Sequence, residues 1–230
     1  MRFNRRTFLI AGCGLVATPA WAEPDPSICP AGDLPAPLPP VLASTGKVRA
    51  LYEKAVVIDG LGGLATSNFK TPPVSKLSPQ DIANARASGV TAINMTLDSE
   101  RLEAVAKSAG VWLEEIDKHP DTYLSIRSFA DLQRAKASKK VGVIFGFQGI
   151  QGALASDLER LNFYHGLGLR IIQLTYNDHC WLGDGCMVPD DQGLMSLGHE
   201  VVTRLNELRI VVDLSHAGVR TARSAPRIRE

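Results

Sequence analysis

Two stretches of this sequence decide its fold, Val57-Ile58-Asp59-Gly60-Leu61-Gly62-Gly63-Leu64 and Val211-Val212-Asp213-Leu214-Ser215-His216. Each is a run of β-branched residues that ends in an acidic residue and a turn. Buried parallel strands are typically apolar throughout, because both of their faces are covered, and polar groups follow at their C-terminal ends. The two stretches therefore predict parallel strands whose C-terminal ends carry a site.

Helical and strand patterns alternate along most of the chain. Strands are expected at residues 56–58, 90–94, 141–145, 171–175 and 210–214, with a short strand-like piece at 123–126. Helices are expected between them, at residues 78–89, 99–118, from 128, 154–166 and 193–208. Five βα units with buried strands predict an α/β fold, either a β/α-barrel or a doubly wound sheet.

The number of strands limits how complete such a barrel is. A closed eight-stranded barrel takes about 250 residues, and few residues follow the fifth expected strand. We therefore expect residues 48–230 to form a truncated, TIM-like β/α-barrel with about five of its eight βα units. Residues 219–230 are rich in arginine and almost without apolar periodicity, which is typical of a broken reading frame.

The composition excludes two classes of partner. Hydrophobic residues make up 45% of the chain and charged residues 21%, as in an ordinary soluble protein. The formal net charge is +1, and without Arg2, Arg5 and Arg6 of the N-terminal segment 22 basic residues face 24 acidic ones. No basic stripe remains that would indicate binding to nucleic acid or to anionic lipid.

The N-terminal residues have the pattern of an export signal. A twin-arginine motif, Asn4-Arg5-Arg6-Thr7-Phe8-Leu9-Ile10, is followed by a short apolar run and by the cleavage pattern Ala20-Trp21-Ala22. An uncleaved anchor is the alternative, but the run is shorter than the roughly 18 apolar residues that a span needs. We therefore expect a twin-arginine signal peptide at residues 1–22, recognition by the twin-arginine translocon, and a periplasmic protein without a stable membrane span.

A proline-rich segment and three cysteines remain in the mature chain. Residues 23–47 contain seven prolines and are expected to form an extended arm. An oxidising periplasm permits a disulfide bond between Cys180 and Cys186. Because Cys29 is a third candidate, the pairing stays open.

Several motifs, in this order and spacing, resemble the membrane (renal) dipeptidase family of zinc hydrolases. They are Val57-Ile58-Asp59-Gly60, residues 142–149, residues 168–175 and Asp213-Leu214-Ser215-His216, and the resemblance extends over roughly residues 48–220. It implies a TIM-like barrel, a pair of zinc ions that activate a water molecule, and hydrolysis of dipeptides or similar small amides.

The resemblance also assigns positions, and most of them are altered. The family's first histidine and aspartate ligands fall on Leu61 and Gly63, and its bridging glutamate falls on Gln148. Its substrate-facing histidine falls on Tyr176, whereas His216 matches a retained ligand of the second metal. The family's remaining histidine ligand and its substrate-clamping arginine and aspartate would follow Glu230.

Charge balance argues against a zinc pair. Gly63 and Gln148 replace two carboxylates of the family, and burying divalent ions without compensating anions is strongly unfavourable. We therefore expect at most one zinc ion.

The candidate site residues follow from these positions. They are Asp59 and Tyr176 as catalytic residues, His216 and, weakly, Gln148 as metal ligands, and Asn177, Asp178 and His179 as substrate-binding residues. Each has a structural alternative: Asp59 as a cap of the following turn, Tyr176 as a packing residue, and His216 as the partner of a local hydrogen bond. The loop at residues 176–189, with the acids that follow it, is equally consistent with ordinary turn chemistry.

Three interpretations of function stay open. The first is a periplasmic, dipeptidase-like metallohydrolase of small peptides, and a homo-oligomer is compatible with it. The second is a non-hydrolytic relative that binds or matures a peptide-like metabolite, favoured by the altered ligands. The third is a non-functional fragment. An open five-stranded sheet exposes unpaired strand edges, and such edges favour aggregation.

Overall fold

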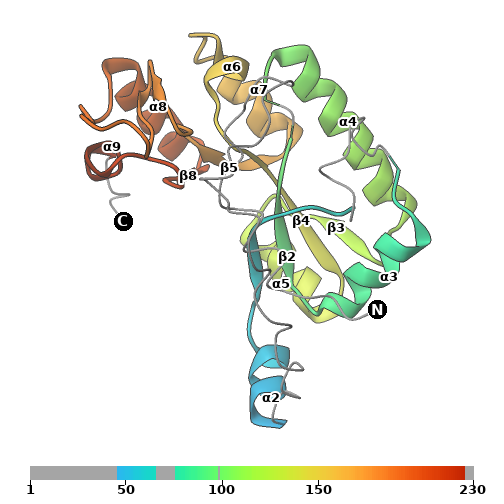
Figure 1. Ribbon diagram of the computed structural model, residues 1–230. Coiled ribbons are helices and arrows are strands. Elements are labelled where there is room, and N and C mark those ends of the chain that lie inside the picture. Colours follow the sequence, from blue (N-terminus) through green and yellow to red (C-terminus); the bar gives the residue numbers. More distant parts are fainter. Residues whose placement is uncertain (1–45, 66–75, 98, 226–230) are drawn as a thin grey trace, which may run out of the picture. The chain divides into compact units, whose positions relative to one another are not determined.

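The computed structural model describes residues 46–65, 76–97 and 99–225 (Figure 1). The chain divides into two compact units, residues 1–53 and 54–230. The described part of the first unit belongs to helix α2 (Gly46–Lys54), so the last two residues of the expected arm, Gly46 and Lys47, are helical. The expected signal peptide and the rest of the arm lie outside the described residues. In the described part of the chain, every helix is too short or too polar to cross a membrane.

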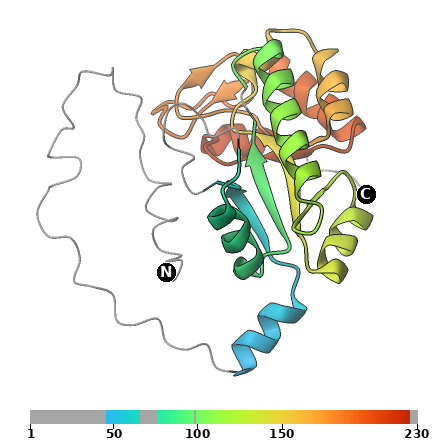
Figure 2. The same cartoon turned by 90° about the vertical axis from the view of Figure 1, so that its right-hand side faces the viewer.

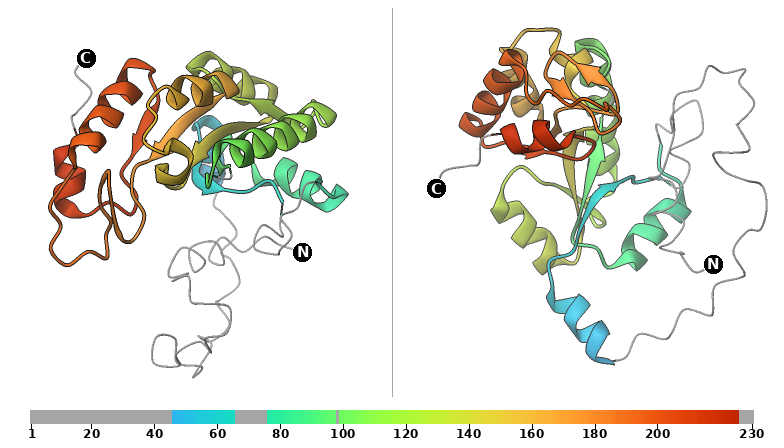
Figure 3. Two further views of the ribbon diagram at one scale, coloured as in Figure 1. Left: turned by 90° about the horizontal axis from the view of Figure 1, so that it is seen from above. Right: turned by 60° about the vertical axis from the view of Figure 1, so that its left-hand side comes forward.

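The second unit is built on a parallel sheet. Five strands follow one another in the order β1-β2-β4-β5-β8. A short sixth strand, β3, pairs with the first residues of β4. Their bounds are β1 (Ile58–Gly62), β2 (Ala92–Thr96), β3 (Tyr123–Ser125), β4 (Val141–Phe147), β5 (Leu169–Gln173) and β8 (Val211–Asp213). The sheet curls into a half-barrel (Figure 3), which confirms the predicted α/β fold with an incomplete barrel.

Helices connect these strands. They are α3 (Pro79–Ser88), α4 (Leu102–Lys118), α5 (Phe129–Ser138), α6 (Gln151–Leu154), α7 (Arg160–Leu167), α8 (Ser196–Glu207) and α9 (Val219–Ser224). The predicted start of α3 is confirmed, because the Ser78 hydroxyl accepts a hydrogen bond from the Asp81 N–H and Pro79 is the first helical residue. The helix predicted at residues 154–166 is confirmed from Arg160 onward, as α7, but its first part is wrong. Ala155 and Ser156 have positive φ angles of 46° and 60°, which end α6 before α7 begins.

The two faces of the sheet are covered differently. The larger apolar cluster joins Ile93, Met95, Phe145 and other strand residues of the same face to α4, α7 and α8. Figure 2 shows α4 running across the sheet. A smaller cluster on the opposite face joins Ala92 and Ile144 to Ala135 of α5. Because neighbouring residues of a strand point to opposite faces, one strand serves both clusters.

Strand β1 begins later than predicted and continues into the glycine-rich segment. The prediction ended the strand at Ile58, whereas the structure pairs Gly62 with Met95 after a shift in register. Close packing accounts for the glycine at position 62, because a Cβ atom at Gly62 would lie 2.7 Å from the Ile93 side chain. The strand therefore needs a residue without a side chain at this position.

Candidate functional site

Three of the predicted site residues follow three neighbouring strands. Gln148 follows β4, Tyr176 follows β5, and His216 follows β8. Because parallel strands end at the same edge of a sheet, these residues lie along one edge. Asp59 lies in β1, at the other end of the sheet order, and is separated from His216 by three strands.

The structure brings Tyr176 and His216 together. Their rings stack with centroids 4.2 Å apart and planes inclined by 20°, and both residues are half-buried. The Nδ1 atom of His216 lies 2.9 Å from the Oδ1 atom of Asn177. Because an amide oxygen only accepts, the hydrogen bond assigns the proton of the neutral imidazole to Nδ1 and leaves the lone pair on Nε2. A ligating histidine is commonly oriented by this kind of hydrogen bond.

A β-hairpin follows the Tyr176 segment and holds it in place. Strands β6 (His179–Cys180) and β7 (Gly183–Asp184) pair in antiparallel fashion. Beyond β7, the Cys186 N–H donates to the His216 carbonyl at 2.7 Å, and the Met187 N–H donates to the Asn177 carbonyl at 2.9 Å. The backbone that follows the hairpin thus binds both His216 and Asn177, the two residues that form the imidazole hydrogen bond.

The sequence interpretation treated this hairpin as a loop, and that was wrong. Two-residue hairpin turns favour pairs such as Asn-Gly, whereas Trp181 and Leu182 occupy the turn here. Gly185 is the residue that could have indicated the hairpin, because the chain passes so close to Tyr176 that only glycine fits. A Cβ atom at Gly185 would lie 2.0 Å from the Tyr176 carbonyl oxygen. Cys180 is buried, Cys186 is exposed, and both are free thiols.

The other predicted loop residues are placed as follows. The Asp178 side chain is exposed. The backbone carbonyl of Asp178 accepts a hydrogen bond from the Gly185 N–H. His179 Nδ1 lies 2.5 Å from the carboxylate of Asp184, which is fully buried. His179 therefore contacts a buried acid, although its own side chain is 66% exposed.

Asp191 serves as a cap, in agreement with the alternative of turn chemistry. Its carboxylate accepts hydrogen bonds from the N–H groups of Gly193, Arg220 and Thr221 and from the Thr221 hydroxyl. Arg220 and Thr221 lie in the first turn of α9, whose own N-cap residue, Gly218, has no side chain. Partial burial alone would raise the pKa of the Asp191 carboxyl, but these hydrogen bonds outweigh it and lower the pKa.

This lowered pKa predicts a pH dependence of stability. Because the folded-state pKa lies below the ordinary carboxyl value of about 4, the stabilisation is complete above that value and is lost as the pH falls through the lower, folded-state pKa. We expect the difference in free energy of unfolding between wild type and Asp191→Asn to shrink on acidification, as measured by urea titration. A difference that stays constant with pH would show that the Asp191 charge does not stabilise the fold.

Asp59 makes a local contact. Its Oδ1 atom accepts a hydrogen bond from the Leu61 N–H at 3.1 Å, as the capping alternative expects. This part of β1 is also held by Asn94, whose side-chain amide donates to the Gly60 carbonyl at 2.8 Å. Gly146 makes room for Asn94, since a Cβ atom there would lie 2.4 Å from its Oδ1 atom. The catalytic role of Asp59 stays a prediction.

The donors in the described residues do not fit a pair of zinc ions. Within residues 46–65, 76–97 and 99–225, no three His, Cys, Asp or Glu side chains are placed to hold a metal. Leu61 is apolar and 44% exposed, and Gln148 offers a neutral amide oxygen. Among the residues that the resemblance places at the metals, His216 is a strong zinc ligand and its ring is oriented by a hydrogen bond.

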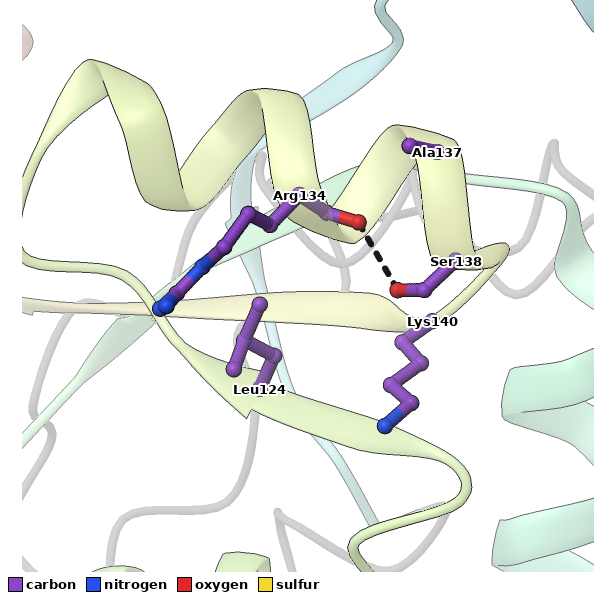
Figure 4. A pocket seen from close by; sticks show the side chains of 5 residues that line it. All are labelled: Leu124, Arg134, Ala137, Ser138 and Lys140. Atoms are coloured by element: carbon purple, nitrogen blue, oxygen red, sulfur yellow. Dashed lines mark hydrogen bonds between the residues drawn. The ribbon is translucent and has the colours of Figure 1, made fainter.

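A hollow of about 510 Å³ lies elsewhere on the second unit. It is lined by Leu124, Arg134, Ala137, Ser138 and Lys140, from β3, α5 and the residue before β4 (Figure 4). The Arg134 guanidinium forms an ion pair with the Asp131 carboxylate, with 2.5 Å between nitrogen and oxygen. No predicted site residue lines this hollow.

Comparison with known families agrees with the motifs and the fold. The sequence profile of the membrane dipeptidase family, peptidase family M19, matches residues 45–228. The chain belongs to this family. Among curated members, the dipeptidase aclJ of Aspergillus oryzae is 27% identical over 114 residues, which cover 47% of this chain and 26% of that enzyme.

Solved structures agree as well. A crystal structure of an amidohydrolase from Pseudomonas aeruginosa is 29% identical, with a TM-score of 0.66, and the match covers 77% of this chain and 51% of that one. A metallopeptidase of family M19, dipeptidase AC, shares the fold with a TM-score of 0.61 at 20% identity, with 72% of this chain and 57% of that one covered. The chain thus spans about half the length of these solved relatives.

Proposed function

We propose that this protein is a dipeptidase-like hydrolase of the periplasm that acts on dipeptides or similar small amides. The observation that carries the proposal is the stacked pair of Tyr176 and His216, found at adjacent strand ends in a chain of the M19 family. The periplasmic location rests on the twin-arginine motif at Arg5 and Arg6. Cell fractionation of a variant with both arginines replaced by lysine tests it, because export by this route should stop.

Each residue of the pair has a separate role in this proposal. The His216 imidazole presents Nε2 to the site, since Nδ1 is occupied by Asn177. The Tyr176 hydroxyl donates a hydrogen bond to the substrate carbonyl, and its ring holds the imidazole in one orientation. The backbone around Asn177 and the exposed Asp178 and His179 side chains form the substrate-binding rim.

The proposal includes at most one zinc ion. His216 is its imidazole ligand and Gln148 a weak one, while the lost carboxylates leave a second ion uncompensated. When bound, such an ion would lower the pKa of a water molecule.

Replacing His216 tests the proposal directly. In the zinc-supplied exported protein, His216→Ala should lower the rate of Ala-Ala hydrolysis by about 10²-fold or more and reduce bound zinc, measured by elemental analysis. His199→Ala is the matched control, because His199 is exposed on α8, and it should change neither quantity. Unchanged hydrolysis in His216→Ala would refute the assigned site.

The non-hydrolytic alternative is favoured by one observation, the replacement of two family carboxylates by Gly63 and Gln148. If this alternative holds, the wild-type protein should bind a dipeptide without cleaving it, and calorimetry would measure the binding. Absence of cleavage by a folded, zinc-supplied wild type would therefore reject the proposed hydrolase and leave this alternative.

A further inference from the structure

His216 occupies a backbone conformation that needs support. Its φ angle is 61°, in the left-handed region that residues with a Cβ atom rarely adopt. Such conformations persist when the surrounding structure holds them in place.

The chain from His216 to Gly218 is paired with the β6–β7 hairpin and its C-terminal extension. The His216 carbonyl accepts the Cys186 N–H at 2.7 Å, and the Gly218 N–H donates to the Asp184 carbonyl at 2.9 Å. Between them, Ala217 forms an antiparallel bridge with Gly185. These backbone bonds hold His216 only as long as residues 217–221 stay against the hairpin.

Asp191 fastens that following segment. Its Oδ1 atom accepts the Gly193 N–H at 2.9 Å and the Thr221 hydroxyl at 3.0 Å. Its Oδ2 atom accepts the Arg220 N–H, and the Thr221 N–H lies 3.3 Å from both oxygens. Gly218 permits this approach, since a Cβ atom there would lie 2.4 Å from Oδ2.

Thr221 connects this cap to the hairpin. Its hydroxyl donates to Asp191 and accepts the Asp184 N–H at 2.9 Å, and the residue is fully buried. Asp184 is the residue whose carbonyl holds Gly218. One network of hydrogen bonds therefore joins the loop before α8, the first turn of α9 and the hairpin around His216.

We infer that Asp191, acting through Thr221 and the first turn of α9, is the positioning residue that sets the imidazole of His216. The inference rests on the proposed function in one respect: His216 is taken as the imidazole of the site. Without the carboxylate, the first N–H groups of α9 lose their acceptor, and Gly218 has no side chain to replace it. The segment after His216 then leaves the hairpin, and the imidazole loses its hydrogen bond to Asn177 and its stacking on Tyr176.

The test measures the ¹⁵N NMR chemical shifts of the His216 ring nitrogens in the full chain. This measurement does not depend on enzymatic activity. In wild type, we expect one protonated ring nitrogen, Nδ1, and one unprotonated nitrogen, Nε2; the signals are assigned by their loss in His216→Ala. In Asp191→Ala and Thr221→Val, both resonances should shift toward the average of the two tautomers. Thr221→Ser, which keeps the hydroxyl, should retain the wild-type spectrum.

A matched control separates positioning from loss of stability. Ser78→Ala removes the cap of α3, a helix outside this network, and should lower the melting temperature without moving the His216 resonances. The inference is overturned if Thr221→Val leaves the resonances unchanged, or if Ser78→Ala shifts them as much as Thr221→Val does. A protein that shows these shifts but does not cleave dipeptides would refute the proposed hydrolase and not the positioning role.

Discussion

Replacing Gly185 with alanine is expected to destabilise the protein by about 3 kcal/mol or more. The added Cβ atom would lie 2.0 Å from the Tyr176 carbonyl oxygen and 2.3 Å from the Asn177 carbonyl carbon. Both are backbone atoms, so no side-chain rotation relieves the clash, and the hairpin must move away from Tyr176. For a domain of this size, the melting temperature should fall by about 2–4 °C for each kcal/mol.

The same substitution at Gly110 is the matched control. Gly110 is exposed within α4, and a Cβ atom there meets nothing within 4 Å. Because alanine is the better helix former, Gly110→Ala should stabilise the protein by about 0.5–1 kcal/mol. If thermal unfolding shows Gly185→Ala to be as stable as wild type, the close pairing of the hairpin with the Tyr176 segment is wrong.

Truncating Tyr164 to alanine should cost about 3–5 kcal/mol, because it opens a cavity in the larger core cluster. Tyr164 is fully buried in α7. Its ring meets that of Phe147, the last residue of β4, edge to face at 5.1 Å. The loss should appear as a lower midpoint of urea unfolding, and it should loosen the strand that carries Gln148.

The conservative change Tyr164→Phe isolates the hydroxyl. This hydroxyl donates to the Ala153 carbonyl at 2.6 Å, and the Arg160 guanidinium donates to the same carbonyl at 3.0 Å. Since the carbonyl keeps one partner, the cost should be only about 1 kcal/mol. Equal losses for phenylalanine and alanine would mean that the hydrogen bond, and not ring packing, is the main contribution of Tyr164.

The main elements of the fold were predictable because their signals are local. Ser78 and Pro79 mark the start of α3 through a cap and a restricted φ angle, both set within one helical turn. The buried strands are evident because both of their faces need apolar residues. The error at Ala155 has a physical cause as well: two residues with positive φ break a helix that the apolar pattern alone would continue.

The site was predictable only in part. His216 and Tyr176 were identified as candidates from their positions after strands, but their stacking depends on the pairing of β5 with β8. Nothing in the order of residues shows that Asn177 meets His216, 39 residues further along. The hairpin at Trp181 and Leu182 escaped prediction because its turn lacks the usual residues and is held by contacts with the segment after β8.

Residue types and their periodicity were thus sufficient to predict the α/β class and the incomplete barrel, and the resemblance of the strand-end motifs indicated the M19 family. These properties depend on which chemical groups are present and on patterns shorter than a helix or strand. The orientation of His216 and the capping role of Asp191 required the folded chain. Both arise from hydrogen bonds between segments that are distant in sequence, and such bonds exist only once the sheet brings the strand ends together.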